Sequence, residues 1–220
     1  MNDVLELPTG PLVDASVALV RSTESRPIVD HSIRTFLFAR LLAEHEGCLN
    51  DAAYDEHLLF AATVMHDLGL GEHARAHARF EVEGADLAAA VLREHGVAEA
   101  DVDRVWEAIA LHSSHGLADR RGLLTYLTYK GVFIDAGQLA DAVADELRKE
   151  VLHAYPKPTE HSYLADAIIE HANRSPAAAP PGSLGAYLLL KQREARVAHQ
   201  GAAPLASKNP PVGPSGVVSA

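Results

Sequence analysis

Hydrophobic residues recur along most of the chain, from about residue 12 to residue 199, at the spacing of three and four positions that marks an α-helix. No segment of the sequence shows the sustained alternation of apolar and polar positions that a half-buried β-strand requires. The pattern therefore predicts an all-α protein. The expected helices cover approximately residues 11–21, 27–46, 51–69, 82–95, 101–112, 123–129, 132–147, 163–173 and 184–199.

The helix expected to end at Gly69 is the most apolar of the set. Its stretch LLFAATVM, residues 58–65, leaves no wide polar face, so we expect this helix to lie at the centre with the others around it. Asn50 and Asp51 offer caps at its start, and Gly69 offers a stop at its end. The residues at the end of this helix are therefore expected near the core.

The chain after residue 200 differs in composition from the helical part. The stretch GAAPLASKNPPVGPSGVVSA combines Pro, Gly, Ala and Ser without a period, and such a composition buries too little apolar surface to become ordered. A chain of 220 residues otherwise has the size of one ordinary domain. We expect a single helical domain over residues 1–200 and a disordered tail over residues 201–220.

Charge and cysteine content limit which binding partners and which cellular compartment are expected. The formal net charge of −11 opposes a broad attraction to nucleic-acid phosphates or to anionic lipid. The lone Cys48 cannot form an internal disulfide, and the N-terminus lacks the basic and apolar regions of a signal peptide. No apolar run approaches the roughly 20 residues that span a bilayer. We expect a cytoplasmic protein that binds neither nucleic acid nor membranes, and homo-oligomerisation stays open.

The dipeptide His66-Asp67 stands at the end of the most apolar helix. An ionised carboxylate in such surroundings is costly unless it is paired or bound to a metal, and a neutral imidazole beside it can bind the same ion. A metal would satisfy both side chains. In the alternative interpretation, Asp67 faces solvent at the frayed end of the helix, and His66 is a hydrogen-bonded core residue.

The order of four residues along the chain, His31, then His66-Asp67, then Asp135, resembles the pattern of the HD-domain superfamily. The resemblance covers residues 28–140 and is closest to the branch that includes cyanamide hydratase. Its blocks are DHSIRTFLFARLL, LLFAATVMHDLGL, RFEVEGADLAAAVLREHG, VWEAIALHSSHGL and the stretch through YKGVFIDAGQ. The resemblance implies a helical bundle in which these four residues hold one metal ion, or two where extra histidines take part.

The ligand set implied by the resemblance combines imidazole nitrogens and carboxylate oxygens without a thiolate. Such a set suits zinc, which we expect first, or iron, manganese or nickel, and it does not suit a structural zinc cage. Four protein ligands on an octahedral ion leave positions open for water or substrate, as in a catalytic site. Without the resemblance, Asp135 would equally well be a helix cap or a surface acid.

Three further residues are candidates for catalysis or substrate binding. His112 falls on a pocket histidine of the related branch and is a candidate for proton transfer, although a histidine at a helix C-terminus also interacts with free carbonyls. Arg34 lies one turn after His31, where it would hold Asp67, meet an anionic substrate or form a surface ion pair. Lys130 would reach the pocket or extend into solvent.

The sequence leaves the roles of several other polar residues open. His95 and His112 are candidates for a second metal, and His115 is a candidate for lining the pocket. Glu81 and Glu83 suit the first turn of a helix without any catalytic purpose. We expect the remaining histidines at the surface: His45, His57, His73, His77, His153, His161, His171 and His199.

These features favour an enzyme that adds water to a small-molecule substrate. The chain lacks the motifs GxSxG, GxxxxGK[ST], HExxH and CxxC, so no motif supports serine-hydrolase, P-loop, zincin or thiol-redox chemistry. The first hypothesis is a metal-dependent hydrolase or hydratase acting on a small polar molecule, including a lyase of the cyanamide hydratase type. The alternatives are a phosphohydrolase on a nucleotide or small phosphate ester, a non-catalytic ligand-binding HD module and a di-iron oxygenase.

Overall fold

The computed structural model describes residues 4–139, 142–159 and 162–201, and these residues form helices and no strand. The prediction of an all-α fold is confirmed. The elements are α1 (Pro11–Thr23), α2 (Arg26–His45), η1 (Cys48–Asn50), α3 (Glu56–Val64), η2 (Leu68–Leu70), α4 (Phe80–Glu94), α5 (Glu99–Leu111), η3 (Ala118–Arg120), α6 (Leu123–Asp135), α7 (Asp145–Ala154), α8 (Tyr163–Asn173), η5 (Pro176–Ala178) and α9 (Leu184–Gly201), where η denotes a short 3₁₀ helix. Among the described helices, none is long and apolar enough to cross a membrane. The predicted tail lies outside the described residues from residue 202 onward.

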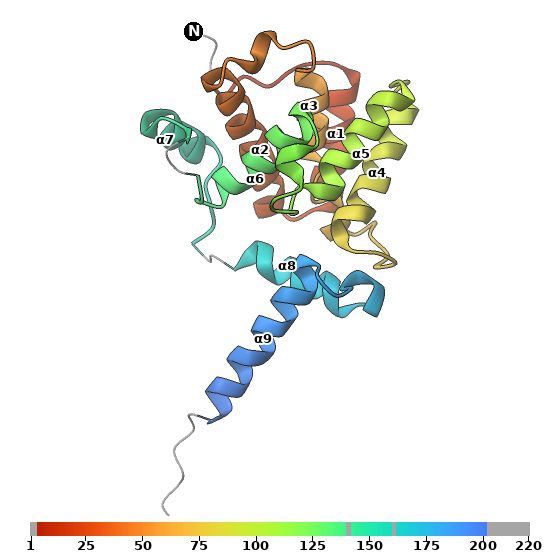
Figure 1. The fold of residues 1–220 in the computed structure, drawn as a ribbon, viewed down its shortest axis with the longest axis vertical. Coiled ribbons are helices and arrows are strands. Elements are labelled where there is room, and N and C mark those ends of the chain that lie inside the picture. Colours follow the sequence, from red (N-terminus) through yellow and green to blue (C-terminus); the bar gives the residue numbers. More distant parts are fainter. Residues whose placement is uncertain (1–3, 140–141, 160–161, 202–220) are drawn as a thin grey trace, which may run out of the picture.

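Helices α2, α3 and α6 form the centre of the bundle, with α4 and α5 packed beside them (Figure 1). Helix α2 contributes Phe36, Leu37 and Phe38 to the core, and residues 58–64 of α3 are all buried. Removing this much apolar surface from water is the main favourable contribution to folding. The prediction that the most apolar helix is central is confirmed.

The central helix α3 is shorter than the sequence predicts at both ends. It begins after Asp55, whose carboxylate accepts hydrogen bonds from two backbone N–H groups of the first turn, at 2.9 and 3.0 Å. Asn50 and Asp51 are therefore not its caps. The helix ends at Val64, and Gly69 lets the following turn pack against the start of α4, where a Cβ would collide with a backbone carbonyl. The His-Asp dipeptide accordingly lies in a turn rather than in a helix.

Helix α6 runs through the glycine at which the sequence predicts an interruption. The predicted piece 123–129 and the start of the predicted piece 132–147 form one helix, Leu123–Asp135, and the last residues of the second piece belong to α7, which starts separately at Asp145. The glycine lies inside α6 because α6 and α2 approach closely there, and a Cβ would meet the carbonyl of Thr35 at 2.5 Å. This close approach holds the C-terminal end of α6 against α2.

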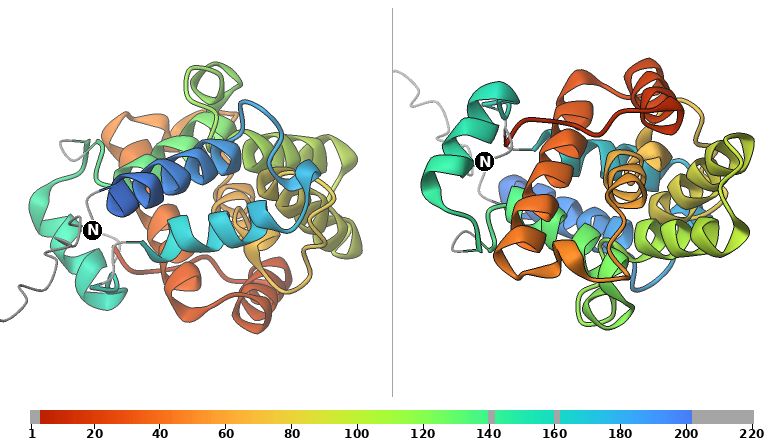
Figure 2. Two further views of the ribbon diagram at one scale, coloured as in Figure 1. Left: turned by 90° about the horizontal axis from the view of Figure 1, so that it is seen from below. Right: turned by 90° about the horizontal axis from the view of Figure 1, so that it is seen from above.

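The C-terminal helices α8 and α9 lie outside the central bundle. Figure 1 shows α8 beneath the bundle and α9 extending away from it, and the view from below in Figure 2 shows the two helices side by side. Helix α8 contacts α4 and η2. Because η2 directly follows the His-Asp dipeptide, α8 covers the neighbourhood of the candidate site.

Candidate metal centre

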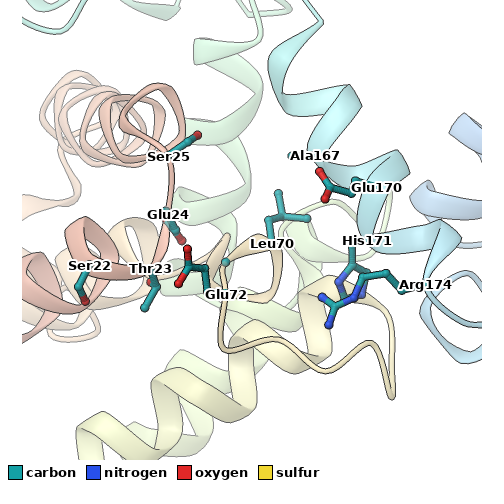
Figure 3. Close-up of a pocket in the computed structure, with 11 residues that line it drawn as sticks. Ser22, Thr23, Glu24, Ser25, Leu70, Glu72, Ala167, Glu170, His171 and Arg174 are labelled. Carbon is teal, nitrogen blue, oxygen red and sulfur yellow. The ribbon is translucent and has the colours of Figure 1, made fainter.

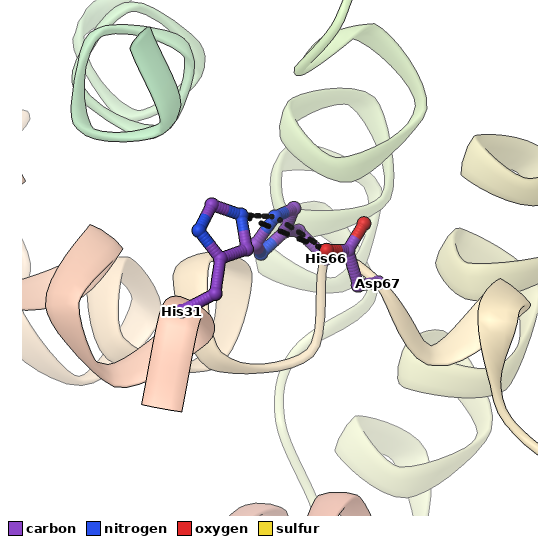
Figure 4. Close-up of side chains that lie close together, drawn as sticks. All are labelled: His31, His66 and Asp67. Atoms are coloured by element: carbon purple, nitrogen blue, oxygen red, sulfur yellow. Dashed lines mark hydrogen bonds and ion pairs between the residues drawn. The ribbon is translucent and has the colours of Figure 1, made fainter. Parts of the chain in front are cut away.

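Three potential metal ligands converge in the interior of the bundle. His31 lies in the second turn of α2, and His66 and Asp67 lie in the turn between α3 and η2. All three side chains are buried, and one ligand atom from each lies within 4.8 Å of the others. Figure 4 shows the two imidazole rings and the carboxylate close together. The structure therefore brings together three of the four residues predicted as metal ligands.

Hydrogen bonds on the far side of each ring orient the two imidazoles. The Nδ1–H group of His66 donates to the carbonyl of Thr63 (2.7 Å), and the Nδ1–H group of His31 donates to Asp135 (2.6 Å). Each ring therefore presents Nε2 as a lone pair, and the two Nε2 atoms lie 3.2 Å apart. Metal-binding histidines are held in the same way, with one nitrogen free for the ion and the other fixed by a partner.

The carboxylate of Asp67 adds a third acceptor. Its Oδ2 lies 3.2 Å from Nε2 of His66 and 3.7 Å from Nε2 of His31, and it has no hydrogen-bond partner among the described residues. Burial opposes the charged forms of Asp67 and His66, but the attraction between these two side chains is the stronger effect. The pKa of Asp67 is therefore lowered, and the pKa of His66 is raised. Buried acceptors that face one another attract a cation, so these residues fit a divalent metal ion.

Asp135, the fourth predicted ligand, lies behind His31. Its carboxylate accepts hydrogen bonds from His31 and from the guanidinium of Arg34, at 2.8 Å from Nε to Oδ1 and at 3.0 Å from Nη2 to Oδ2. Burial raises the pKa of such an acid, but His31 and Arg34 outweigh burial and lower the pKa of Asp135. Asp135 therefore orients His31, and its additional role as a metal ligand stays a prediction.

Arg34 is completely buried and holds Asp135, not Asp67. Its guanidinium also donates to two backbone carbonyls of the segment that follows α7, at 3.2 and 3.4 Å, and to the hydroxyl of Tyr163 at 3.3 Å. The interpretation as a surface ion pair is wrong, because the turn of α2 that carries Arg34 faces α6. A guanidinium occupied in this way positions the ligands and leaves little capacity for an anionic substrate.

His112 lies beside the cluster at the end of α5. Its Nδ1–H group donates to the carbonyl of Ile109 (2.7 Å), while its Nε2 lies 3.9 Å from Oδ1 of Asp67. Its ring centroid lies 4.7 Å from that of His66. Burial, assisted by His66, lowers the pKa of His112 to about 4, so the ring is neutral at physiological pH. One nitrogen binds a helix carbonyl, as expected at a helix C-terminus, and the other faces the cluster, while a role of His112 in proton transfer stays a prediction.

The comparison with protein families agrees with this geometry. Residues 28–200 match the HD domain, a segment that contains the cluster and extends beyond the predicted motif region of residues 28–140. The chain belongs to the HD-domain family. HD domains typically are metal-dependent hydrolases that bind divalent metal ions. No curated protein matches the chain by sequence, so the assignment of the HD domain rests on the family match and on the site itself.

A lysine does approach the metal centre of the HD domain, but it is not the one that the sequence suggests. The Nζ atom of Lys130 lies over the rings of Tyr126 and Tyr129, at 5.4 and 5.5 Å from their centroids. Lys157 instead lies 3.4 Å from Oδ1 of Asp135 and also donates to the backbone carbonyl of that residue. The sequence could not single out Lys157, because it lies in a loop and only the tertiary fold gives it a partner.

Two other histidines that the sequence suggests for the site lie elsewhere. His95 is exposed, and its Nδ1 contacts the carbonyl of Val91 at 2.9 Å, as expected at a helix C-terminus. His115 is hydrogen bonded to the hydroxyl of Tyr129 at 2.5 Å. Helix α5, of 13 residues and about 20 Å long, separates His95 from His112, so the hypothesis that these two bind a second metal is wrong.

The acids near the start of α4 have partners within the fold. Glu81 is fully buried, pairs with Arg79 at 2.6 Å and accepts a hydrogen bond from the hydroxyl of Ser113 at 2.5 Å. Glu83 accepts hydrogen bonds from the backbone N–H groups of residues 75–78. Both acids therefore stabilise the loop before α4, and this is the structural role that the sequence alone leaves undecided.

Proposed function

We propose that this HD domain is a metal-dependent hydrolase or hydratase that adds water to a small polar organic molecule. The observation that carries the proposal is the convergence of Nε2 of His31, Nε2 of His66 and Oδ2 of Asp67 on one buried point. Imidazole and carboxylate ligands without thiolate suit zinc, the first candidate, and also iron, manganese or nickel. With Asp135 as a fourth ligand, positions for water would remain open.

A divalent ion held by these residues would supply Lewis acidity and would lower the pKa of a bound water toward neutrality. The residues of the chain have separate tasks around it. His112 is neutral and faces Asp67 with Nε2, so it is placed to accept a proton at that atom and to return it. Arg34 and Asp135 hold His31 in the tautomer that leaves its Nε2 free.

The charges around the centre favour a neutral or cationic substrate over a phosphate ester. Within the described part of the chain, three cations around the cluster are already bound to acids: Arg34 and Lys157 to Asp135, and Arg79 to Glu81. A phosphate requires unpaired positive charge at its site. Addition of water to a small nitrogen-containing compound, the chemistry of the cyanamide hydratase branch, is therefore the first candidate reaction, and phosphate-ester hydrolysis is the second.

The metal content per chain, measured by elemental mass spectrometry on untagged protein, tests this proposal. About one equivalent of a divalent metal is expected in the wild type and close to none in His66→Ala or Asp67→Ala, because each variant removes one of the converging metal ligands. His95→Ala is the matched control, since His95 is exposed and bonded to its own helix, and it should keep the metal. Circular dichroism should show that all four proteins are folded.

Each other outcome favours a different alternative. A wild type that binds no metal, even after reconstitution with zinc, iron, manganese and nickel, would contradict the proposal and favour a non-catalytic ligand-binding module. Two irons per chain together with oxygen consumption would favour a di-iron oxygenase. A metal-loaded protein that releases phosphate from nucleotides, and that adds water to none of a panel of nitriles, amides and amidines, would favour the phosphohydrolase.

A further inference from the structure

A cavity of about 560 Å³ lies between the α1–α2 connection, η2 and α8. Figure 3 shows Glu24 and Glu72 on one side of it and Glu170, His171 and Arg174 of α8 on the other. A volume of this size suits a small-molecule ligand. Because the lining carries three acids and one arginine, its charge favours a cationic ligand.

The carboxylate of Glu24 is the part of this cavity that most needs a partner. Glu24 directly follows α1, and both of its oxygens are buried without a hydrogen-bond partner among the residues that the structure describes. Burial raises the pKa of Glu24 well above its ordinary value, and the charge of Asp67 raises it further. A buried carboxyl without donors costs stability, and a ligand that supplies the donors gives a reason for its presence.

His171 adds a second buried acceptor on the opposite wall. The sequence places it at the surface, which is wrong because α8 packs against the loop before α4. Its Nε2–H group donates to the carbonyl of Ala78 (3.1 Å), and its Nδ1 has no partner in the described part of the chain. Arg174 donates to the carbonyl of Ala74 (2.6 Å). The buried atoms of the cavity that lack partners, the oxygens of Glu24 and Nδ1 of His171, are therefore acceptors, and a ligand that pairs with them must bring donors.

The cavity and the metal centre share one segment of the chain. Leu70 lines the cavity, belongs to η2 and follows Asp67 by less than one helical turn. The backbone N–H group of Leu70 donates to the carbonyl of Asp67 (2.7 Å). A ligand in the cavity therefore contacts the turn that directly follows His66 and Asp67.

We propose that this cavity binds an amidinium, guanidinium or ammonium group of the substrate, with Glu24 as its anchor. A planar amidinium or guanidinium presents two parallel N–H groups, which match the two oxygens of a carboxylate. Nδ1 of His171 accepts a hydrogen bond from a further donor at the other wall. That the ligand is the substrate rests on the proposed function, whereas the preference for a cation rests on the cavity alone.

Calorimetric titration with three probes of one shape tests the proposal. The probes are benzamidine, which is cationic, benzamide, which is neutral, and benzoate, which is anionic. Benzamidine should bind the wild type at least about tenfold more tightly than the other two, because it alone forms a charge-assisted pair with a carboxylate. Glu24→Gln keeps the shape of the side chain and should abolish the preference. Glu94→Gln, at the exposed end of α4, is the matched control and should retain it.

A thermal melt separates a binding role of Glu24 from a structural one. Because no described group bonds to its carboxylate, Glu24→Gln should keep or raise the melting temperature. A variant that melts at a lower temperature than the wild type would overturn the proposal. Equal affinity for the three probes, or a preference for benzamidine that survives Glu24→Gln, would overturn it as well.

Manganese loading distinguishes a failure of this proposal from a failure of the proposed function. Bound Mn²⁺ should enhance the nuclear relaxation of benzamidine protons strongly, because η2 lines the cavity and directly follows Asp67. Enhancement that is lost in Glu24→Gln would support the proposal. Binding of benzamidine without enhancement would overturn its assignment to the substrate. Glu24-dependent binding in a protein that takes up no metal would support the cavity and contradict the proposed function.

Discussion

Two buried carboxylates of this HD domain, those of Glu83 and Asp67, have opposite surroundings. The carboxylate of Glu83 accepts hydrogen bonds from four consecutive backbone N–H groups, those of residues 75–78. The carboxylate of Asp67 instead faces the acceptor nitrogens of His31 and His66. An acid whose donors come from the fold stabilises the fold, whereas an acid that faces acceptors is suited to a cation from outside. The donors around an acid, and not its burial, therefore separate a structural role from a functional one.

The candidate metal centre repeats this difference on a smaller scale. Its outer residues, Asp135 and Arg34, are paired through a bidentate ion pair, while the inner atoms of His31, His66 and Asp67 face one another. The outer pair is therefore expected to affect stability, and the inner cluster is expected to affect metal binding. Substitutions in the two layers should separate these effects.

Arg34→Met should cause the largest loss of stability. It leaves the buried carboxylate of Asp135 without its bidentate partner, and breaking a buried ion pair from one side costs about 3–5 kcal/mol. The free energy of unfolding from urea denaturation measures this loss. Arg93→Met is the matched control, because Arg93 forms the same kind of ion pair with Glu99 at the surface, and its urea midpoint should stay near that of the wild type.

Equal losses in Arg34→Met and Arg93→Met would contradict this expectation. They would show that burial of the ion pair is not what makes the outer layer stabilising. A stable Arg34→Met that still binds metal would also remove the need for Arg34 to position Asp135.

Glu83→Gln should have a smaller effect on stability and none on metal content. The amide group replaces one carboxylate oxygen with a donor that faces backbone N–H groups, which costs about 1–3 kcal/mol. Urea denaturation measures the loss, and elemental mass spectrometry measures the metal. Glu94→Gln, at the exposed end of α4, should leave both unchanged. Loss of metal in Glu83→Gln would break the comparison, because it would make the Glu83 region part of the metal centre.

The sequence predicts the fold well wherever a helix is specified by its own residues. Helix α8 has the predicted bounds, Tyr163–Asn173, because its apolar spacing and its flanking loops agree. The errors occur where contacts between distant segments decide. Gly131 resembles a helix break in isolation, yet it is required inside α6 by the close approach of α2. Similarly, α3 ends at Val64 because the next turn packs against α4.

The candidate site is predictable only in part, for a related reason. His66 and Asp67 attract notice in the amino-acid sequence because they follow a strongly apolar stretch, whereas His31 is identified only through the resemblance to the HD-domain pattern. Lys157 and Glu24 have no motif. They reach the site or its neighbouring cavity through a loop and a helix end that only the tertiary fold brings there.

The stability difference between wild type and Glu83→Gln should also depend on pH, which is the smallest effect expected. Burial opposes the ionised form, but the backbone N–H groups of the preceding loop, that of His77 first, outweigh it and lower the pKa of Glu83 below its ordinary value of 4.5. An acid with a lowered pKa in the folded state contributes stability that is fully present above its unfolded-state pKa and is lost as the pH falls through the folded-state pKa. Urea denaturation at a series of pH values should therefore show a constant difference at neutral pH that shrinks in the acid range. A difference that stays constant throughout would mean that the loop binds the side chain without regard to its charge, and the contrast with Asp67 would then lie in geometry alone.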